Sequence, residues 1–64
     1  MKRDLVYGFI SRFVERNGYS PTVREIADGL GISTSTAYYH LTQLRDEGRI
    51  SYKPGMSRTI KLGE

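Results

Sequence analysis

The chain contains no cysteine and a single histidine, and its hydrophobic residues never form a long run. Without cysteine neither a disulfide nor a thiolate metal site can form, and the scattered carboxylates do not favour another metal site. We therefore expect no metal, no cofactor and no small-molecule ligand. No run approaches the roughly 20 apolar residues that span a bilayer, and no signal-peptide pattern opens the chain. These absences predict a cytoplasmic protein that does not act at a membrane.

A catalytic set is also missing. No combination of nucleophile, base and orienting group accompanies His40, so we predict that the protein is not an enzyme. His40 is adjacent to Leu41 at a helical position, and packing at the edge of the core is favoured there over a role as base or ligand.

The 64 residues form one domain, 1–64, near the lower size limit for folding without disulfides or metals. The net charge is +3, and the excess is uneven. Residues 49–64 alone carry +3, from Arg49, Lys53, Arg58 and Lys61 against Glu64. A basic C-terminal segment in a chain of small net positive charge is typical of a domain that contacts nucleic acid over a small area, although small domains are often basic by chance.

Hydrophobic periodicity predicts a first helix over about residues 3–17, ended by Gly18. Pro21 prevents a helix from running through the connector that follows. We expect the whole apolar stripe of this helix to lie in the core: Leu5, Val6, Phe9, Ile10, Phe13 and Val14.

A second helix is predicted over about residues 22–30, where Thr22 and Glu25 have the spacing of a capping box. Helix initiation is the role expected of Glu25. Gly31 supplies a left-handed stop, and only a tight turn separates it from the next start signal, Ser33. Two helices joined in this way form a helix-turn-helix.

The third helix is predicted over about residues 33–47, with Ala37, Leu41 and Leu44 as a narrow apolar stripe. Its opposite face has almost no charge, and hydroxyl, amide and phenol groups suit the reading of base edges and phosphates. The amides of the first turn, capped by Ser33, suit a phosphate. The residues of this face are Ser35, Thr36, Tyr39, Thr42 and Gln43, with Tyr38 at its edge.

After Gly48 the period changes to that of two strands within residues 50–62, joined by a turn at Pro54 and Gly55. Lys53 and Arg58 make both shoulders of the turn basic, so the hairpin can lie along a phosphate backbone. The predicted fold is α+β: a three-helix winged helix-turn-helix with a C-terminal two-stranded hairpin as its wing.

These residues resemble the DNA-binding domain of LexA-type repressors. The resemblance covers roughly residues 5–62 and is most specific in Gly-Tyr-Ser-Pro-Thr-Val-Arg-Glu-Ile-Ala over 18–27. It extends through His40-Leu41-x-x-Leu44 to Gly48-x-Ile50, and weakly into Ser57-Arg58-x-Ile60.

This resemblance implies that the third helix enters the major groove and that the loop of the wing, residues 53–58, approaches the backbone. It also implies operator contacts from Ser33, Ser35, Thr36, Tyr38 and Tyr39. The family carries a second, self-cleaving Ser–Lys protease domain. Because this sequence ends at Glu64, we expect either an excised domain or a stand-alone relative, without self-cleavage. Tyr38 and Tyr39 stand where the family more often has small or acidic residues, so no operator sequence carries over.

We therefore predict a sequence-specific double-stranded DNA-binding domain of a LexA-like transcriptional regulator. Tight binding would need a homodimer on two half-sites, although no dimerisation helix is evident. Tyr38 and Tyr39 could instead stack single strands or contact another protein, and the alternative function is a winged-helix protein–protein interaction module. Arg45 could contact phosphate or pair with nearby acids. The predicted DNA-binding residues are Ser33, Ser35, Thr36, Tyr38, Tyr39, Gln43, Lys53 and Arg58.

Overall fold

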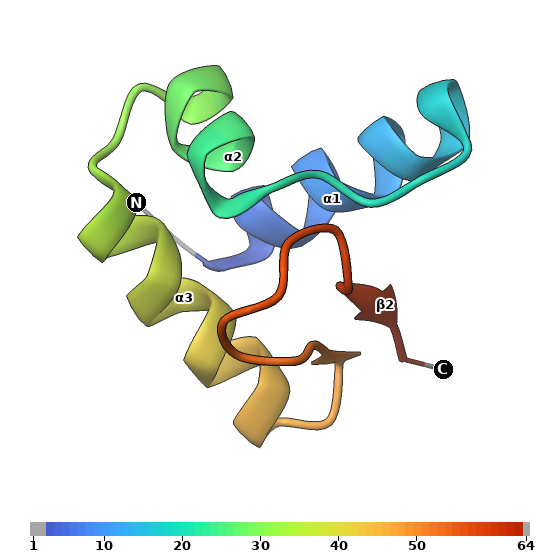
Figure 1. Cartoon of the computed structure of the whole chain (residues 1–64). Helices are drawn as coiled ribbons and strands as arrows, with labels where there is room; N and C mark the ends of the chain where they lie inside the picture. Colours follow the sequence, from blue (N-terminus) through green and yellow to red (C-terminus); the bar gives the residue numbers. More distant parts are fainter. Residues whose placement is uncertain (1–2, 64) are drawn as a thin grey trace.

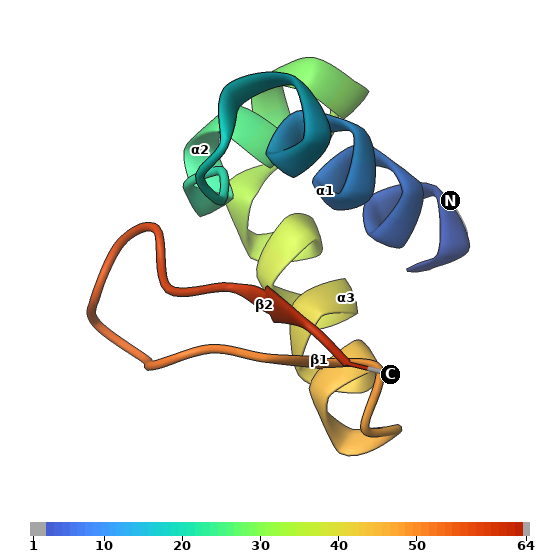
Figure 2. The same cartoon turned by 90° about the vertical axis from the view of Figure 1, so that its right-hand side faces the viewer.

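The computed structural model describes residues 3–63. Helices α1 (Arg3–Asn17), α2 (Val23–Leu30) and α3 (Thr34–Asp46) precede two short strands, β1 (Ile50–Ser51) and β2 (Lys61–Leu62). The helices surround one core, and the hairpin lies beside the C-terminal half of α3 (Figure 1). Seen from the side, the loop between the strands extends sideways from α3 and rises toward the start of α2 (Figure 2). This is the predicted three-helix winged helix-turn-helix.

The core takes a single line of residues from α1, with Val6 and Ile10 fully buried one turn apart. The prediction that the whole stripe of α1 is core was wrong: Leu5 is 54% exposed, and Phe9 and Phe13 are only half-buried. Two neighbouring helices cannot cover a stripe that wide, and Leu5 is turned about 100° from Val6 around the helix axis. The other core residues are Ile26, Ala27, Ala37, Leu41, Leu44, Ile50 and Ile60.

The ends of α2 follow the predicted signals. The Thr22 hydroxyl accepts from the Glu25 amide at 3.0 Å, and the Glu25 carboxylate accepts from the Thr22 amide at 2.9 Å. Gly31 ends the helix in the left-handed conformation, with φ of 68°. Ser33 then caps α3, so the turn joining the two helices spans only three residues. The caps themselves lie outside the helices, which is why each helix begins one residue later than predicted.

The hairpin is antiparallel and pairs Ile50 with Leu62 and Ser51 with Lys61. Its strands are shorter than the predicted alternation, because a side chain replaces the next ladder bonds. The Thr59 hydroxyl accepts from the Lys53 amide at 2.9 Å and donates to the Met56 carbonyl at 3.1 Å. The loop is therefore closed by Thr59 rather than by continued strand pairing.

Ion pairs join the start of α1 to the end of α3. Arg3 pairs with Glu47, and Arg49 pairs with Asp4 at 2.6 Å. The Arg49 guanidinium also lies over the Tyr7 ring, 4.7 Å from its centroid. These contacts hold the start of α1 against the C-terminal end of α3, which is the end of α3 farther from the turn between α2 and α3. No helix in the described part of the chain is long and apolar enough to cross a membrane.

Candidate nucleic-acid interface

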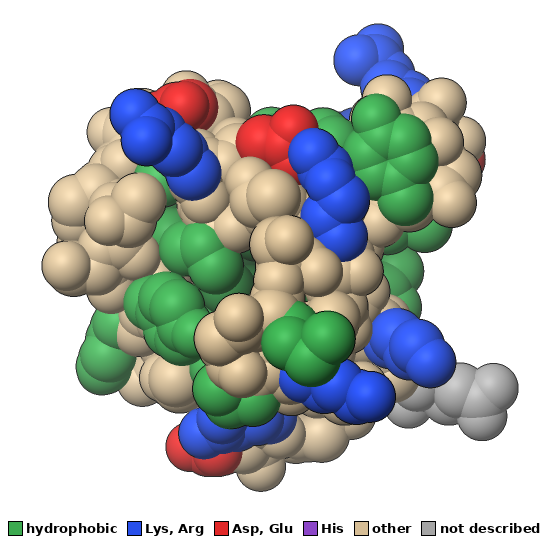
Figure 3. Space-filling model, in the orientation of Figure 1, with side chains coloured by type: hydrophobic (Ala, Val, Ile, Leu, Met, Phe, Trp, Pro, Cys, Tyr) green, Lys and Arg blue, Asp and Glu red, His purple; other side chains and the backbone are tan. Residues whose placement is uncertain are grey.

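Helix α3 turns its apolar stripe inward and its uncharged polar face outward. Ala37, Leu41 and Leu44 have no exposed surface, whereas Tyr39 is 59% exposed. His40 is buried at the edge of the core, as predicted. Figure 3 shows a largely uncharged surface over the first half of α3, with Lys and Arg side chains gathered around the hairpin. The exposed or half-buried residues of the outward face are Ser35, Thr36, Tyr38, Tyr39, Thr42 and Gln43.

The first turn of α3 presents hydroxyls and backbone amides to solvent. The Ser33 hydroxyl accepts from the Thr36 amide at 3.1 Å and donates to the Thr36 hydroxyl at 2.9 Å. The amides before Thr36 have no acceptor within the helix, because a helix leaves its first N–H groups unpaired. Such a helix start, with the positive end of the helix dipole, is suited to an anionic oxygen.

Tyr39 and Gln43 form a hydrogen-bonded pair in the middle of the outward face. The Gln43 amide donates to the Tyr39 hydroxyl at 2.9 Å, and the Thr42 hydroxyl donates to the Tyr39 carbonyl at 2.7 Å. The pair still offers the Tyr39 hydroxyl proton and the Gln43 side-chain carbonyl to a ligand. A donor and an acceptor held side by side can read the edge of a base pair.

An aromatic contact joins α3 to the hairpin. The Tyr38 ring packs edge-on against the Tyr52 ring, and the Arg45 guanidinium lies 5.3 Å from the Tyr52 centroid on the ring's face. Arg45 also pairs with Asp46 at 3.6 Å. Sequence reasoning weighed this pairing for Arg45 but missed Tyr52, because alternation along a strand does not say which helix a strand residue meets.

The two basic residues that flank the turn of the wing, Lys53 and Arg58, have different surroundings. Lys53 is exposed, and none of its side-chain atoms forms an ion pair in the described structure. The Arg58 guanidinium donates to the Ser20 carbonyl at 3.0 Å and contacts Glu25 at 3.0 Å. The expectation that Glu25 serves helix initiation alone was wrong, because its carboxylate also binds a residue of the wing that is far away in the sequence.

The Glu25 carboxylate is held in its charged form. The Thr22 backbone amide, and after it the Arg58 guanidinium, lower the pKa of Glu25 below its ordinary value. Both groups donate hydrogen bonds that are stronger to the carboxylate than to the protonated acid. The capping box of α2 and the contact to the wing therefore share one charged group.

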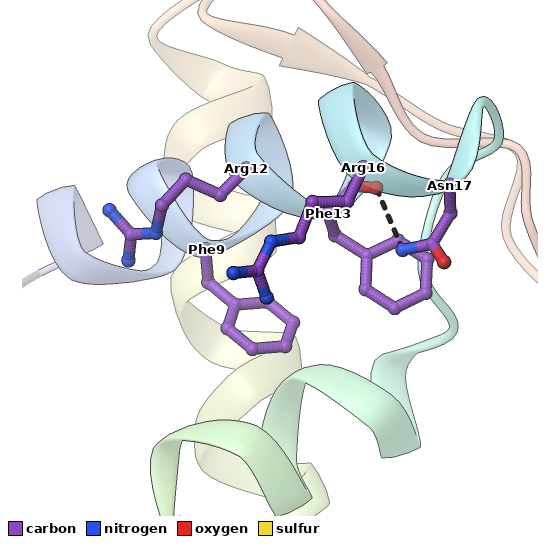
Figure 4. Close-up of a pocket in the computed structure, with 5 residues that line it drawn as sticks. All are labelled: Phe9, Arg12, Phe13, Arg16 and Asn17. Atoms are coloured by element: carbon purple, nitrogen blue, oxygen red, sulfur yellow. Dashed lines mark hydrogen bonds between the residues drawn. The ribbon is translucent and has the colours of Figure 1, made fainter.

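A groove of about 390 Å³ lies on another side of the molecule, lined by α1 residues Phe9, Arg12, Phe13, Arg16 and Asn17. Figure 4 looks into this groove with α3 behind α1, so the groove opens away from the outward face of α3. Within residues 3–63, no cluster of three acidic or histidine side chains could hold a metal ion.

Three helices with a tight turn between α2 and α3, followed by a hairpin, define a winged helix-turn-helix domain. The chain belongs to the LexA DNA-binding domain family, whose model matches residues 2–59. The family predicted from the sequence is thus confirmed, and the chain is a DNA-binding, regulatory domain.

Several curated relatives are LexA repressors. That of Desulfatibacillum aliphaticivorans is 45% identical over 62 residues, which cover 95% of this chain and 30% of the relative. That of Roseiflexus sp. is 45% identical over 95% of this chain and 28% of the relative. That of Carboxydothermus hydrogenoformans is 38% identical over 89% of this chain and 28% of the relative. The chain spans about 30% of the length of these relatives.

Proposed function

We propose that this domain is the DNA-reading part of a transcriptional repressor acting on the chromosome in the cytoplasm. In this proposal α3 enters the major groove of duplex DNA and the hairpin wing follows the adjacent backbone. The observation that carries the proposal is the outward face of α3, which is polar and uncharged and lies beside a basic wing. Charged side chains normally cover such a helix face, whereas hydroxyl, amide and phenol groups suit close contact with bases.

The contacts divide into two kinds. Ser33 and the first-turn amides of α3 bind a phosphate, and Lys53 neutralises another from the wing. The base edges are read from the middle of α3, where Tyr39 and Gln43 present a donor and an acceptor and the Tyr38 ring can meet a thymine methyl. The remaining proposed contacts on this helix are Ser35 and Thr36.

A single domain of this size offers too few contacts for tight specific binding, so we propose that two copies bind two half-sites. Symmetric helix-turn-helix dimers place their recognition helices about 34 Å, one turn of DNA, apart. Analytical ultracentrifugation of the domain with one-half-site and two-half-site duplexes tests this arrangement. Binding that stays one to one on a two-half-site duplex would contradict it.

The decisive experiment is selection of bound sequences from a random duplex pool, followed by titration of the selected duplex and a scrambled one at several salt concentrations. If about five phosphates are neutralised, log K should fall with log salt with a slope of about −4 to −5. The selected duplex should bind more tightly than the scrambled one at every salt concentration. Equal, weak binding to both would instead favour a protein-interaction module that uses the Tyr38–Tyr39 surface.

A further inference from the structure

Arg58 connects the wing to the start of α2, 33 residues earlier in the chain. Its guanidinium donates to the Ser20 carbonyl at 3.0 Å and approaches both carboxylate oxygens of Glu25, at 3.0 and 3.3 Å. The same group lies over the Tyr19 ring, 4.7 Å from the centroid. A planar guanidinium is the side chain suited to bind a carboxylate with two bonds while stacking on a ring.

The backbone at Arg58 is also unusual. Its φ is 57°, in the left-handed region, and it is the one residue other than glycine with positive φ in residues 3–63. Such a conformation in a residue with a side chain persists when the surrounding contacts hold it in place. The contacts that hold it here come from the connector and from α2, so the conformation of the wing depends on its attachment to the helix-turn-helix.

No other ion pair within residues 3–63 joins the loop of the wing to α2. Tyr52 links the wing to α3, through the ring of Tyr38 and the guanidinium of Arg45. Between these two anchors the small cleft that separates the wing from the helices has a volume of only about 30 Å³. Side-chain contacts thus join the wing to both helices of the helix-turn-helix, in addition to the packing of Ile50 and Ile60 in the core.

We propose that Arg58 is a positioning residue, which fixes the wing against α2 through Glu25 instead of neutralising a phosphate. This proposal rests on the proposed function. In it, Arg58 sets the distance between the wing, which contacts the DNA backbone, and α3, which contacts the bases of the same duplex. Lys53, exposed on the other shoulder, is then the basic group of the wing that meets the phosphate.

Substitution of Glu25 distinguishes two possible roles of Arg58, binding a phosphate and positioning the wing, because the two roles predict opposite changes in duplex affinity. Glu25→Gln removes a negative charge from the domain, so Coulomb attraction to the duplex alone would strengthen binding. The same change would also release Arg58 for a phosphate. If Arg58 positions the wing, however, Glu25→Gln weakens binding despite the more favourable charge. Glutamine still completes the capping box, so α2 keeps its start signal.

The experiment compares the duplex affinity and salt slope of five proteins: wild type, Glu25→Gln, Arg58→Ala, Arg58→Lys and the double variant Glu25→Gln/Arg58→Ala. We expect each of the first two variants to weaken binding about tenfold and the double variant to lose little more, because both changes break one contact. Arg58→Lys should also weaken binding, since an ammonium keeps the charge but cannot bind Glu25 with two bonds. Two further variants, Lys53→Ala and Glu25→Gln/Lys53→Ala, are the matched controls, in which the effects of Lys53→Ala and Glu25→Gln should add.

A measurement without DNA tests the same contact. The amides of Lys53 and Met56 donate hydrogen bonds within the loop of the wing. Their hydrogen exchange should become faster in Glu25→Gln and Arg58→Ala, while the amides of α1 keep their protection. The proposal is overturned if Glu25→Gln binds the duplex as tightly as wild type or more tightly, or if the losses in the double variant add. Failure of the wild type to bind any duplex would contradict the proposed function instead, and unchanged exchange in the variants would then still refute the anchoring by Arg58.

Discussion

The ring of Tyr38 on α3 meets the ring of Tyr52 in the wing edge-on, with the centroids 6.0 Å apart and the ring planes at 79°. This is a favourable arrangement for two aromatic rings, because the positive edge of one faces the negative face of the other. Arg45 covers Tyr52 from α3 and brings its guanidinium within 3.4 Å of the Tyr52 hydroxyl. Helix α3 and the wing are therefore joined by one aromatic contact.

Tyr52→Ala should destabilise the domain by about 1–2 kcal/mol, because it removes a half-buried ring together with its aromatic pair. Urea unfolding monitored by circular dichroism measures the change. Tyr52→Phe is the control: it keeps the ring and loses only the hydroxyl near Arg45, so its stability should stay within about 0.5 kcal/mol of wild type. Equal losses in the two variants would show that the hydroxyl, and not the ring contact, holds the wing.

Tyr39→Ala should relax base preference and leave folding intact. The side chain is 59% exposed, is not among the hydrophobic residues packed on the core and contacts the ring of His40 only at the edge of the core, so the free energy of unfolding should change by less than about 0.5 kcal/mol. Discrimination between the selected and a mutated half-site should fall by about 1–3 kcal/mol, the range for one good base contact. Gln43→Ala should affect the same base position, because Gln43 and Tyr39 are hydrogen bonded. If Tyr39→Ala unfolds the domain, its proposed role in base reading is wrong.

The elements whose signals are local were predictable from the sequence. The capping box at Thr22, the left-handed Gly31 and the Ser33 cap each depend on residues within one helical turn, and all three are present. The inward stripe of α3 was predictable for a similar reason, since Ala37 and Leu41 follow the helical period. Propensity and periodicity act over a few residues, and so these features could be placed without coordinates.

The contacts between distant segments could not be predicted. Glu25 and Arg58 are 33 residues apart, and nothing around either residue indicates that the loop of the wing folds back to α2. The exposure of Leu5 likewise depends on where α2 and α3 lie against α1, which periodicity along a single helix does not give. The missing information in both cases is the relative placement of elements.

Lys53→Ala should weaken binding to all duplexes by a similar factor and reduce the magnitude of the salt slope by about 0.9, the value for one lost phosphate contact. Lys53 is exposed on the wing, so the stability of the free domain should not change. Titration of the selected and scrambled duplexes at three or more salt concentrations measures both quantities. A loss confined to the selected duplex would mean that Lys53 contacts a base.

Acid should weaken the attachment of α1 to the end of α3. The hydrogen bond from Arg3 lowers the pKa of Glu47 below its ordinary value of 4.5. Arg3 stays charged throughout, because an arginine side chain keeps its proton in this pH range. The stability contributed by Glu47 is therefore complete above about pH 4.5 and is lost as the pH falls through the lower pKa of the folded state. Urea midpoints at about pH 6 and at about pH 3 should differ less in Glu47→Gln than in wild type. The same pH dependence in both proteins would exclude Glu47 as a source of the acid sensitivity.

Gly29 lies in α2 against the Phe9 ring, and a Cβ added there would come within 2.3 Å of Phe9 Cε2. Gly29→Ala should therefore destabilise the domain by about 1 kcal/mol, because the overlap, typically about 1–3 kcal/mol, exceeds the gain of about 1 kcal/mol from better helix propensity. Chemical unfolding of the purified domain measures this difference.

The control is Gly29→Ala in a protein that already carries Phe9→Ala. With the ring removed, only the helix propensity of alanine remains, so Gly29→Ala should become stabilising by up to about 1 kcal/mol. A change of sign between the two backgrounds is the signature of a direct steric contact in a double-mutant cycle. The Phe9 ring also lines the open groove on α1, into which it could turn (Figure 4). If Gly29→Ala stabilises the protein in both backgrounds, the ring turns into the groove without loss, and Phe9 is not fixed by its packing against α2.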